Sequence, residues 1–259
     1  MSGCGEKRTA KLGRVTLGEG MPAICVPVMG RTIPEIAQAA ARAKAAQADV
    51  IELRIDSLTD RPGLQEAMDA CRAVRGSAEE IPLLFTLRTR RDGGAGTADV
   101  QAYEALLGAV MESRVCDAVD CELSAGEAVF ARLAEQAKAA GVLLVGSSHE
   151  FGEIGDLQRA AQWLKRQEAL GADVCKAAVM TRTNAEAFAL AQVYADVYEQ
   201  LTIPMIAIAM GPAGIMTRVG AACMGSCLTF GTAGEASAPG QIDAKKLRTA
   251  LEIVQDAIE

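Results

Sequence analysis

Short apolar segments recur along the chain, and longer segments with the spacing of an amphipathic helix separate them. Eight of the apolar segments are typical of buried strands, because each is short, continuous and rich in apolar, often β-branched residues. They are AICVPVM (23–29), DVIELRI (49–55), IPLLFTLR (81–88), VCDAVDCEL (115–123), GVLLVGSSH (141–149), ADVCKAAVM (172–180), PMIAIAM (204–210) and SCLTFG (226–231). Eight units of strand and helix in about 250 residues predict an α/β fold in which a parallel sheet closes into a (β/α)₈ barrel, or TIM barrel.

Several helix starts carry a local signal. The pattern Ser/Thr-x-x-Glu lets a hydroxyl and a carboxylate bond the free N–H groups of a first helical turn, so it predicts a capping box. The pairs are Thr32 with Glu35, Ser124 with Glu127 and Thr183 with Glu186. The last segment places apolar residues on one helical face, which predicts a helix packed on the barrel. These residues are Leu247, Ala250, Leu251, Val254 and Ile258.

The segment before the first unit, residues 1–20, contains RVTLGEG, which is typical of a small strand and turn. We predict that it caps the bottom of the barrel, the end opposite the active site. No interdomain linker, low-complexity tract or repeat divides the sequence, so residues 1–259 are predicted to form a single barrel domain. The first residues lack the apolar core of a signal peptide, and no apolar run reaches the roughly 18 residues of a membrane span.

Composition narrows the class of function. A net charge of −7 argues against nucleic-acid binding, which needs a basic surface, so an anionic ligand would require a local cluster of arginines. The eight cysteines lie mostly within apolar segments, which favours reduced, buried thiols in a cytoplasmic protein. Cys223 and Cys227 lack the C-x₂-C spacing of zinc sites, and the chain has one histidine, so we predict no metal site.

Two residues stand out at the predicted strand ends, where the active site of a (β/α)₈ barrel forms. Lys176 is the one lysine inside an apolar strand, the sixth, where burial penalises the charged form. A neutral lysine can attack a carbonyl group and form an imine, whereas a structural lysine would pair with an acid or extend to solvent. His149, the only histidine, ends the neighbouring fifth strand and could act as general acid and base.

Further polar residues are predicted at the same end of the barrel. On the second strand, Glu52 and Arg54 share one face because side chains alternate along a strand. They form either an ion pair or part of a polar binding site. Arg88 ends the third strand, and Asp92 lies just beyond it in RTRRDGGAG, which could equally be a solvated loop.

Two glycine-containing segments follow the seventh and eighth strands. MGPAGIMTR contains Arg218, and FGTAGEASAPGQ has the small residues of a loop that could move over the site. The glycines at positions 211, 214, 231 and 234 could instead form a phosphate-binding nest, which is a common use of these two loops.

Taken in order, the motifs IELRID, FTLRT, SSHEF, ADVCKAAV, MGPAGIMTR and SAPGQ resemble those of the type I 3-dehydroquinate dehydratase family. The resemblance extends over nearly the whole chain, from about residue 22 onward. It implies a (β/α)₈ barrel, a homodimer, and catalysis without metal or organic cofactor. The implied reaction removes water from the small-molecule substrate 3-dehydroquinate to give 3-dehydroshikimate, the third step of the shikimate pathway. A biosynthetic and a catabolic role both stay open.

The resemblance also implies roles for individual residues. Lys176 resembles the Schiff-base lysine, His149 the acid/base histidine, and Asp92 occupies the position of the acid that orients this histidine. The positions that bind substrate correspond to Glu52, Arg54, Arg88, Met210, Arg218, Ser237 and Gln241. The segment from Ser237 to Gln241 resembles the loop that closes over the substrate and holds its carboxylate.

The chain departs from the family pattern at three positions. It has Asp92 where the family usually has Glu, Glu150 where Asp or Asn usually follows the histidine, and Ile208 in place of a methionine. Adjacent residues on a strand point to opposite faces, which disfavours Glu150 as the partner of His149. We therefore predict that Asp92 orients the histidine.

Two other functions stay open at this point. A class I aldolase acting on a sugar phosphate also forms an imine on a barrel lysine, and the glycines could bind its phosphate. Arg218 and SAPGQ favour a carboxylate ligand instead. A non-catalytic ligand-binding relative would keep the barrel, but the presence of both Lys176 and His149 argues against it.

Overall fold

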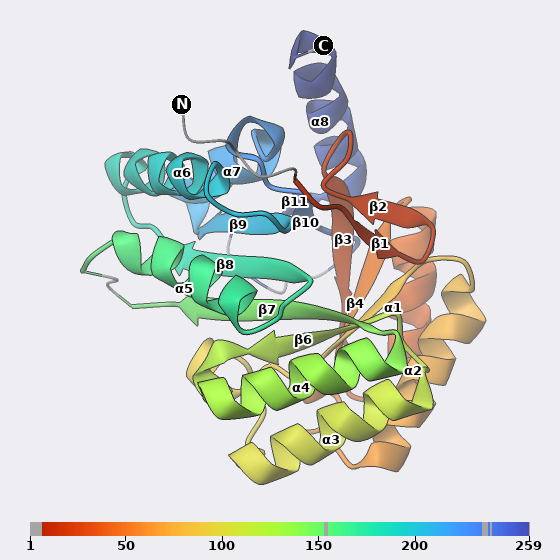
Figure 1. The fold of residues 1–259 in the computed structure, drawn as a ribbon. Coiled ribbons are helices and arrows are strands. Elements are labelled where there is room, and N and C mark those ends of the chain that lie inside the picture. The colour runs from red at the N-terminus through yellow and green to blue at the C-terminus, as the bar shows by residue number, and fades with distance from the viewer. Residues whose placement is uncertain (1–6, 153–154, 235–237, 239, 259) are drawn as a thin grey trace.

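The computed structural model describes residues 7–152, 155–234, 238 and 240–258. Within these residues, eight parallel strands form the predicted barrel (Figure 1). The strands are β3 (Ala23–Val28), β4 (Val50–Arg54), β5 (Leu83–Thr86), β6 (Ala118–Glu122), β7 (Leu143–Glu150), β8 (Val174–Met180), β9 (Met205–Met210) and β10 (Leu228–Thr232).

Closure of the barrel follows from the pairing of these strands. Each strand from β3 to β8 pairs in parallel with the next, and β10 pairs with β3. A bridge joins Met205 on β9 to Ser226, and the Cys227 N–H donates to the Met205 carbonyl over 2.8 Å, just before β10 begins. A further short strand, β11 (Ile242–Asp243), pairs with β10 outside the barrel order. The (β/α)₈ barrel is therefore confirmed.

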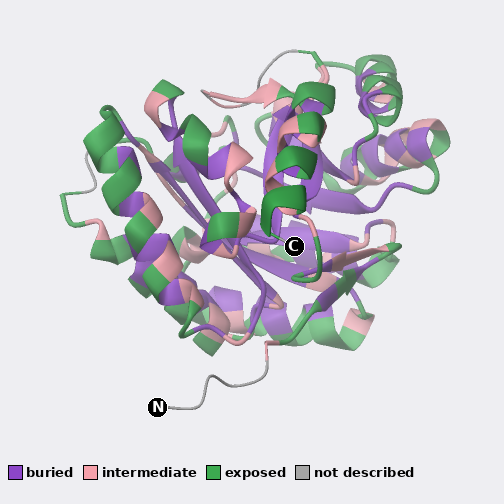
Figure 2. Ribbon diagram, turned by 90° about the horizontal axis from the view of Figure 1, so that it is seen from above, coloured by how far each residue is buried: buried purple, intermediate pink, exposed green. Residues whose placement is uncertain are grey.

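Helices follow the strands and surround the barrel, with their buried residues turned toward it (Figure 2). They are α1 (Ile33–Ala45), α2 (Leu64–Ala78), α3 (Val100–Ser113), α4 (Glu127–Ala140), α5 (Gln158–Ala169), α6 (Asn184–Tyr198), α7 (Ile215–Val219) and α8 (Ala244–Ile258). The hydroxyl half of two predicted capping boxes is confirmed, because Thr32 and Thr183 accept the N–H groups of Glu35 and Glu186 over 3.3 and 3.1 Å. The Glu35 and Glu186 carboxylates accept the N–H groups of the residues just before these caps, and not those of the threonines.

The capping box predicted at Ser124 is wrong. Helix α4 begins at Glu127 with Gly126 as its N-cap, and Ser124 lies in the preceding 3₁₀ turn (Leu123–Ala125). Gly126 has a φ of +105°, a backbone conformation that favours glycine. The turn therefore displaces the start of the helix beyond the reach of the serine hydroxyl.

The N-terminal segment closes the bottom of the barrel as predicted. Strands β1 (Ala10–Leu12) and β2 (Val15–Leu17) pair in antiparallel fashion. Leu12 and Leu17 are buried and pack with the first inward-facing residues of the barrel strands. A Cβ at Gly13 would lie 3.0 Å from Pro82, which directly precedes β5. The hairpin thus covers the N-terminal ends of the strands.

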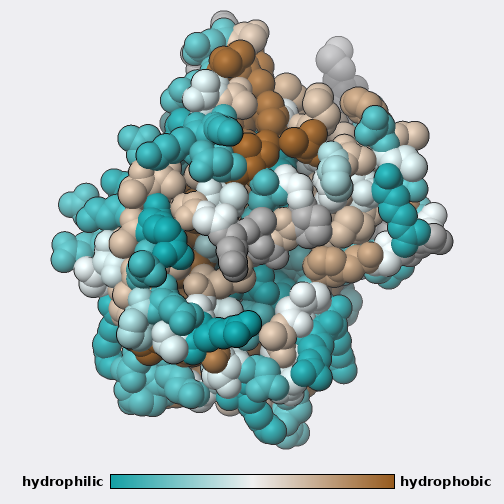
Figure 3. Space-filling model, turned by 180° about the vertical axis from the view of Figure 1, so that it is seen from behind, coloured by the Kyte–Doolittle hydropathy of each residue, from teal (hydrophilic) through white to brown (hydrophobic). Residues whose placement is uncertain are grey.

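Exposed apolar side chains gather on the last three helices. They are Phe188, Ile215, Met216, Ile253 and Ile258. Figure 3 shows the apolar strip over α8 at the top of the molecule. In this helix Leu247 and Leu251 are buried as predicted, but Ile258 is 55% exposed, because the last turns extend past the barrel. The homodimer implied by the resemblance stays a prediction.

Two further sequence predictions concern the thiols and the membrane. The seven cysteines within the described residues are free thiols, and all except Cys223 are buried. In the part of the chain that the structure describes, no helix combines the length and the apolar character required to cross a membrane.

Candidate active site

A cavity opens at the C-terminal ends of the barrel strands, with an empty volume of about 550 Å³ that is partly open to solvent. Nine of the ten residues that the sequence analysis singled out line it, namely Glu52, Arg54, Arg88, Asp92, His149, Lys176, Met210, Arg218 and Gln241. The tenth, Ser237, lies outside the described residues.

Strand alternation explains why this cavity has a polar floor. The inward residues near the start of each strand are apolar, such as Val50 on β4 and Val174 on β8, and they fill the lower barrel. Because every second residue of a strand faces the same side, the next inward residues form a layer above them. On these two strands that layer contains Glu52 and Lys176, both buried.

Lys176 extends from β8 into the cavity and is only 4% exposed. Its Nζ lies 3.4 Å from Asp120 Oδ2, 3.7 Å from Glu52 Oε1 and 4.6 Å from the centroid of the Phe230 ring. Two carboxylates and an aromatic face stabilise positive charge on this nitrogen. The lysine therefore does pair with acids, but it does so on the wall of the cavity, where a ligand can reach it.

Helix α5 holds the backbone of Lys176 through one buried side chain. Gln167 Oε1 accepts the Lys176 N–H over 2.9 Å, and Gln167 Nε2 donates to the Lys176 carbonyl over 3.1 Å and to Ser148 Oγ over 3.0 Å. Gly146 leaves room for this side chain, because a Cβ there would lie 3.0 Å from Gln167 Cβ. Gln167 thus joins β8 at Lys176 to β7 at the residue before His149.

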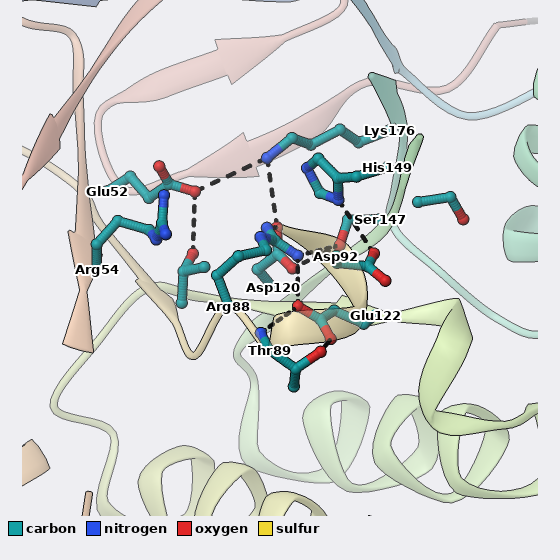
Figure 4. A network of polar contacts seen from close by, with 12 residues as sticks. Glu52, Arg54, Arg88, Thr89, Asp92, Asp120, Glu122, Ser147, His149 and Lys176 are labelled. Carbon is teal, nitrogen blue, oxygen red and sulfur yellow. Dashed lines mark hydrogen bonds and ion pairs between the residues drawn. The ribbon is translucent and has the colours of Figure 1, made fainter. Parts of the chain in front are cut away.

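An ionic network lies next to Lys176 (Figure 4), and the sequence analysis singled out Arg88 in it but not Asp120, Glu122 or Ser147. Arg88 Nη2 donates to Asp120 Oδ2 over 2.7 Å, while Nη1 donates to Glu122 Oε1 over 2.9 Å and to Ser147 Oγ over 3.0 Å. Ser147 in turn donates to Asp120 Oδ1 over 2.6 Å. Both terminal nitrogens of Arg88, which we expected to bind substrate, are bonded to protein groups and hold the two carboxylates in place.

The pKa values within this network shift in different directions. Burial opposes ionisation of Asp120, but the cations Arg88 and Lys176 outweigh it and hold the pKa of this carboxyl well below its usual range. Burial likewise opposes the charge of Arg88, whose pKa the carboxylates nevertheless raise. At Glu122 burial prevails over Arg88 and raises the pKa. Asp120 is therefore the fixed negative charge beside Lys176.

The imidazole of His149 is bonded to an acid. Its Nδ1 lies 3.1 Å from Asp92 Oδ2, whereas the Glu150 carboxylate accepts the Gly152 N–H over 2.9 Å. With Nδ1 bonded to a carboxylate, Nε2 is the nitrogen left for proton transfer, and Figure 4 shows it on the Lys176 side of the ring. The contact is the one that the sequence analysis favoured.

Burial sets the charge state of this pair. It lowers the pKa of His149 well below 6.5, and the cations Arg88 and Lys176 act in the same direction. Burial also raises the pKa of Asp92 against the opposing effect of Arg88. Asp92 lies at the buried end of a 3₁₀ turn (Arg90–Asp92), so its interpretation as part of a solvated loop is wrong. A histidine that is neutral at pH 7 is ready to accept a proton.

The sequence left open an ion pair between Glu52 and Arg54. In the structure Arg54 pairs with Asp56 instead. Arg54 Nε and Nη2 donate to the two Asp56 oxygens over 2.8 Å each. Burial opposes the charge of Asp56, but Arg54 outweighs it and lowers the pKa of this carboxyl. Glu52 instead accepts a hydrogen bond from Thr86 Oγ1 over 3.1 Å and contacts Lys176.

Arg218 provides a further cation in the lining of the cavity. It lies buried on the short helix α7, and its Nη1 donates to the Phe230 carbonyl over 3.3 Å. Burial lowers the pKa of Arg218 to about 10, so its guanidinium remains charged at pH 7. Met210, Ile208 and Gln241 line the same cavity.

Backbone packing or conformation accounts for three of the glycines in and after β9 and β10. A Cβ at Gly214 would lie 2.2 Å from the Ala209 carbonyl oxygen, and one at Gly231 would lie 3.0 Å from the Cα of Ala244. Gly211 has a φ of +88°, which favours glycine. These positions require glycine for backbone reasons that do not involve a phosphate.

Comparison with known proteins identifies the family. The chain matches the family model described as type I 3-dehydroquinase over residues 24–258. Similar curated proteins named 3-dehydroquinate dehydratase include that of Klebsiella pneumoniae, 37% identical over 93% of this chain and 96% of the relative. That of Listeria monocytogenes is 35% identical over 93% of this chain and 95% of the relative.

Solved structures give the same result. The type I 3-dehydroquinate dehydratase from Clostridium difficile, solved with covalently modified comenic acid, superposes with a TM-score of 0.92 at 30% identity, over 97% of this chain and 99% of that chain. The 3-dehydroquinate dehydratase from Geobacillus kaustophilus also gives a TM-score of 0.92 at 30% identity, over 98% and 99%. Since the family match spans every cavity residue named above, the chain belongs to the type I 3-dehydroquinase family.

Proposed function

We propose that this protein is a 3-dehydroquinate dehydratase, a lyase of the shikimate pathway that removes water from 3-dehydroquinate to give 3-dehydroshikimate. Membership of the family supports this reaction, because relatives that match over nearly the whole chain carry that name. The same match disfavours a class I aldolase. The packing of Gly214 and Gly231 also weakens the argument for a phosphate site.

The observation that carries the proposed mechanism is the placement of Lys176 and His149 on adjacent strands in one cavity. The neutral amine of Lys176 attacks the ketone carbon of the substrate and a C–N bond forms. With one proton taken up from solution, the C–O bond breaks and the carbonyl oxygen leaves as water. The resulting iminium carries a positive charge, which attracts the electron pair released when the neighbouring C–H bond breaks. The carboxylates around Lys176 Nζ stabilise this charge.

His149 then moves the protons. Its neutral imidazole accepts the proton from the carbon next to the iminium, and the electron pair shifts to nitrogen to form an enamine. The enamine expels the hydroxyl on the following carbon, which leaves as water with a proton returned by His149. Because one side chain serves both bonds, the hydrogen and the hydroxyl leave from the same face of the ring. Hydrolysis of the product imine then releases Lys176.

The remaining cavity residues position the substrate. Arg218 and Gln241 hold its carboxylate, and Ser237, outside the described residues, is expected to assist. Arg54 and Glu52, in the same cavity, bind ring hydroxyls. Arg88 acts mainly by holding the carboxylates near Lys176, because both of its terminal nitrogens are already bonded.

The reaction and the nucleophile can be tested together. Purified enzyme with 3-dehydroquinate is expected to produce the ultraviolet absorbance of a conjugated enone. Borohydride added with substrate should inactivate the enzyme and leave a mass adduct on the peptide that contains Lys176. An active enzyme without an adduct, or with one on a different lysine, would exclude the imine at Lys176, while inactivity with 3-dehydroquinate but turnover of a sugar phosphate would support the aldolase.

The partner of His149 can be tested by substitution. Asp92→Ala is expected to lower kcat by about tenfold or more, because the carboxylate that orients the imidazole and stabilises its protonated form is lost. The acid limb of the wild-type kcat/KM profile is expected below pH 6.5, since burial lowers the pKa of His149. In the variant this limb should move lower still, because a histidine that loses a neighbouring anion loses pKa.

Glu150→Ala is the matched control for this substitution. Its carboxylate bonds the Gly152 N–H, so kcat and the acid limb should change little. If Glu150→Ala impairs kcat and Asp92→Ala does not, Glu150 is the residue that orients the histidine.

A further inference from the structure

Asp120 is the closest carboxylate to the nitrogen that reacts. Its Oδ2 lies 3.4 Å from Lys176 Nζ, and its side chain is fully buried. Glu52 lies farther away, at 3.7 Å, and is bonded to a neutral hydroxyl, that of Thr86. Neither the strand pattern nor the residues implied by the family resemblance singled out Asp120.

Both oxygens of Asp120 are held by other groups. Arg88 donates to Oδ2 over 2.7 Å and Ser147 donates to Oδ1 over 2.6 Å. A carboxylate held in this way cannot rotate away from Lys176, and protonation would cost it the bond to the arginine. Asp120 is therefore poorly suited to carry protons and well suited to provide a constant charge.

Arg88 does not fully neutralise the negative charge of Asp120, so this charge can also stabilise a positive charge on Lys176. Arg88 lies between Asp120 and Glu122, so one cation faces two carboxylates, and the second cation in contact with Asp120 is Lys176. A positive charge buried without a partner is strongly unfavourable. A nitrogen that becomes positive as the imine forms thus finds a compensating charge already in place.

We infer that Asp120 is the fixed counter-ion of the positively charged nitrogen on Lys176, and that it stabilises the iminium intermediate. This inference rests on the proposed function. Iminium formation from the neutral amine consumes the amine, the ketone and one proton, and it produces the iminium and one water molecule.

Asp120→Asn keeps the shape of the side chain and removes its charge. Without the counter-ion, the iminium is disfavoured relative to the neutral amine, and its formation takes up a proton. The amount of adduct trapped by borohydride at saturating 3-dehydroquinate is expected to fall tenfold or more at neutral pH. It should recover as the pH is lowered, because protons drive the step. A loss of structure alone would not produce this recovery.

Other titratable groups face Lys176 and must be considered in the pH series. They are Glu52 on β4, His149 on β7 and the Cys25 thiol on β3, together with Arg88 behind Asp120. These groups are common to wild type and variants. The difference between their pH profiles therefore isolates Asp120.

Glu122→Gln is the matched control. It removes the other carboxylate of Arg88, which bonds Nη1 and makes no contact with Lys176 in the described network. Trapping in this variant should keep the pH dependence of wild type. An equal loss in both variants would show that release of Arg88, and not the missing counter-ion, is responsible, and would overturn the inference.

Ser147→Ala provides a second route if Asp120→Asn does not fold. It removes one hydrogen bond from Asp120 while keeping the charge, so a smaller loss of adduct with the same acid recovery is expected. The inference is overturned if a folded Asp120→Asn yields as much adduct as wild type with the same pH dependence. If Asp120→Asn does not fold, the same result in Ser147→Ala would overturn it. Dehydratase activity of wild type is measured in the same series, and an inactive wild type that yields no adduct overturns the proposed function and this inference with it.

Discussion

His149→Ala is expected to reduce turnover of 3-dehydroquinate by about 10²–10⁴-fold, the usual contribution of a general acid–base group. The imidazole is neutral because burial lowers its pKa, and it lies in the cavity that also contains the Lys176 amine. Imine formation requires that amine and not the imidazole. Borohydride should therefore still trap an adduct on Lys176 in the variant, although the enone absorbance nearly disappears.

The separation of the two steps is what makes this experiment informative. Lys176→Ala serves as the reference, because it should lose both the adduct and turnover. Turnover of His149→Ala within about tenfold of wild type would remove the histidine from the proton transfers. Loss of the adduct in a folded His149→Ala would instead place the histidine in the imine step.

The second large effect is expected at Arg218. Arg218→Ala should raise KM and lower kcat/KM, because a desolvated substrate carboxylate loses its cation. Such a loss is worth about 2–5 kcal/mol, or roughly 30- to 4,000-fold. Arg218 is buried, and burial lowers its pKa only to about 10, so the charge is present throughout the neutral range.

Arg218→Lys helps to distinguish charge from geometry. It keeps a cation but loses the planar fork that matches a carboxylate, so an intermediate KM is expected. Because Arg218 also bonds the Phe230 carbonyl, thermal unfolding should be measured for both variants. Unchanged KM in a folded Arg218→Ala would mean that another group anchors the carboxylate.

The barrel was predictable because its strands carry a strong local signal. A continuous apolar run such as that around Val174 can be stable only when it is covered on both faces, and alternating helices supply the cover. The place of Lys176 and His149 followed from the same rule, since active sites form at the C-terminal ends of the strands. Local signals failed where a turn intervened, as at Ser124.

Asp120 and Gln167 show why the rest of the site was not predicted. Asp120 lies in an apolar strand on the inward face. A single sequence does not show that Arg88, which lies two residues past the end of the neighbouring strand β5, reaches it. Gln167 lies on an amphipathic helix, where a polar residue is normally assigned to solvent. Its burial depends on the space that Gly146 leaves on another element, and helix periodicity contains no information about that space.

The position of Gln167 has a consequence for local unfolding. Its amide satisfies both the N–H and the carbonyl of Lys176, so detachment of α5 would leave two buried backbone groups without partners. Opening of this helix and loss of the position of the nucleophile therefore belong to one cooperative unit. Amide hydrogens in α5 and at Lys176 should therefore exchange with solvent at matched rates, and that common rate would measure how often the active site opens.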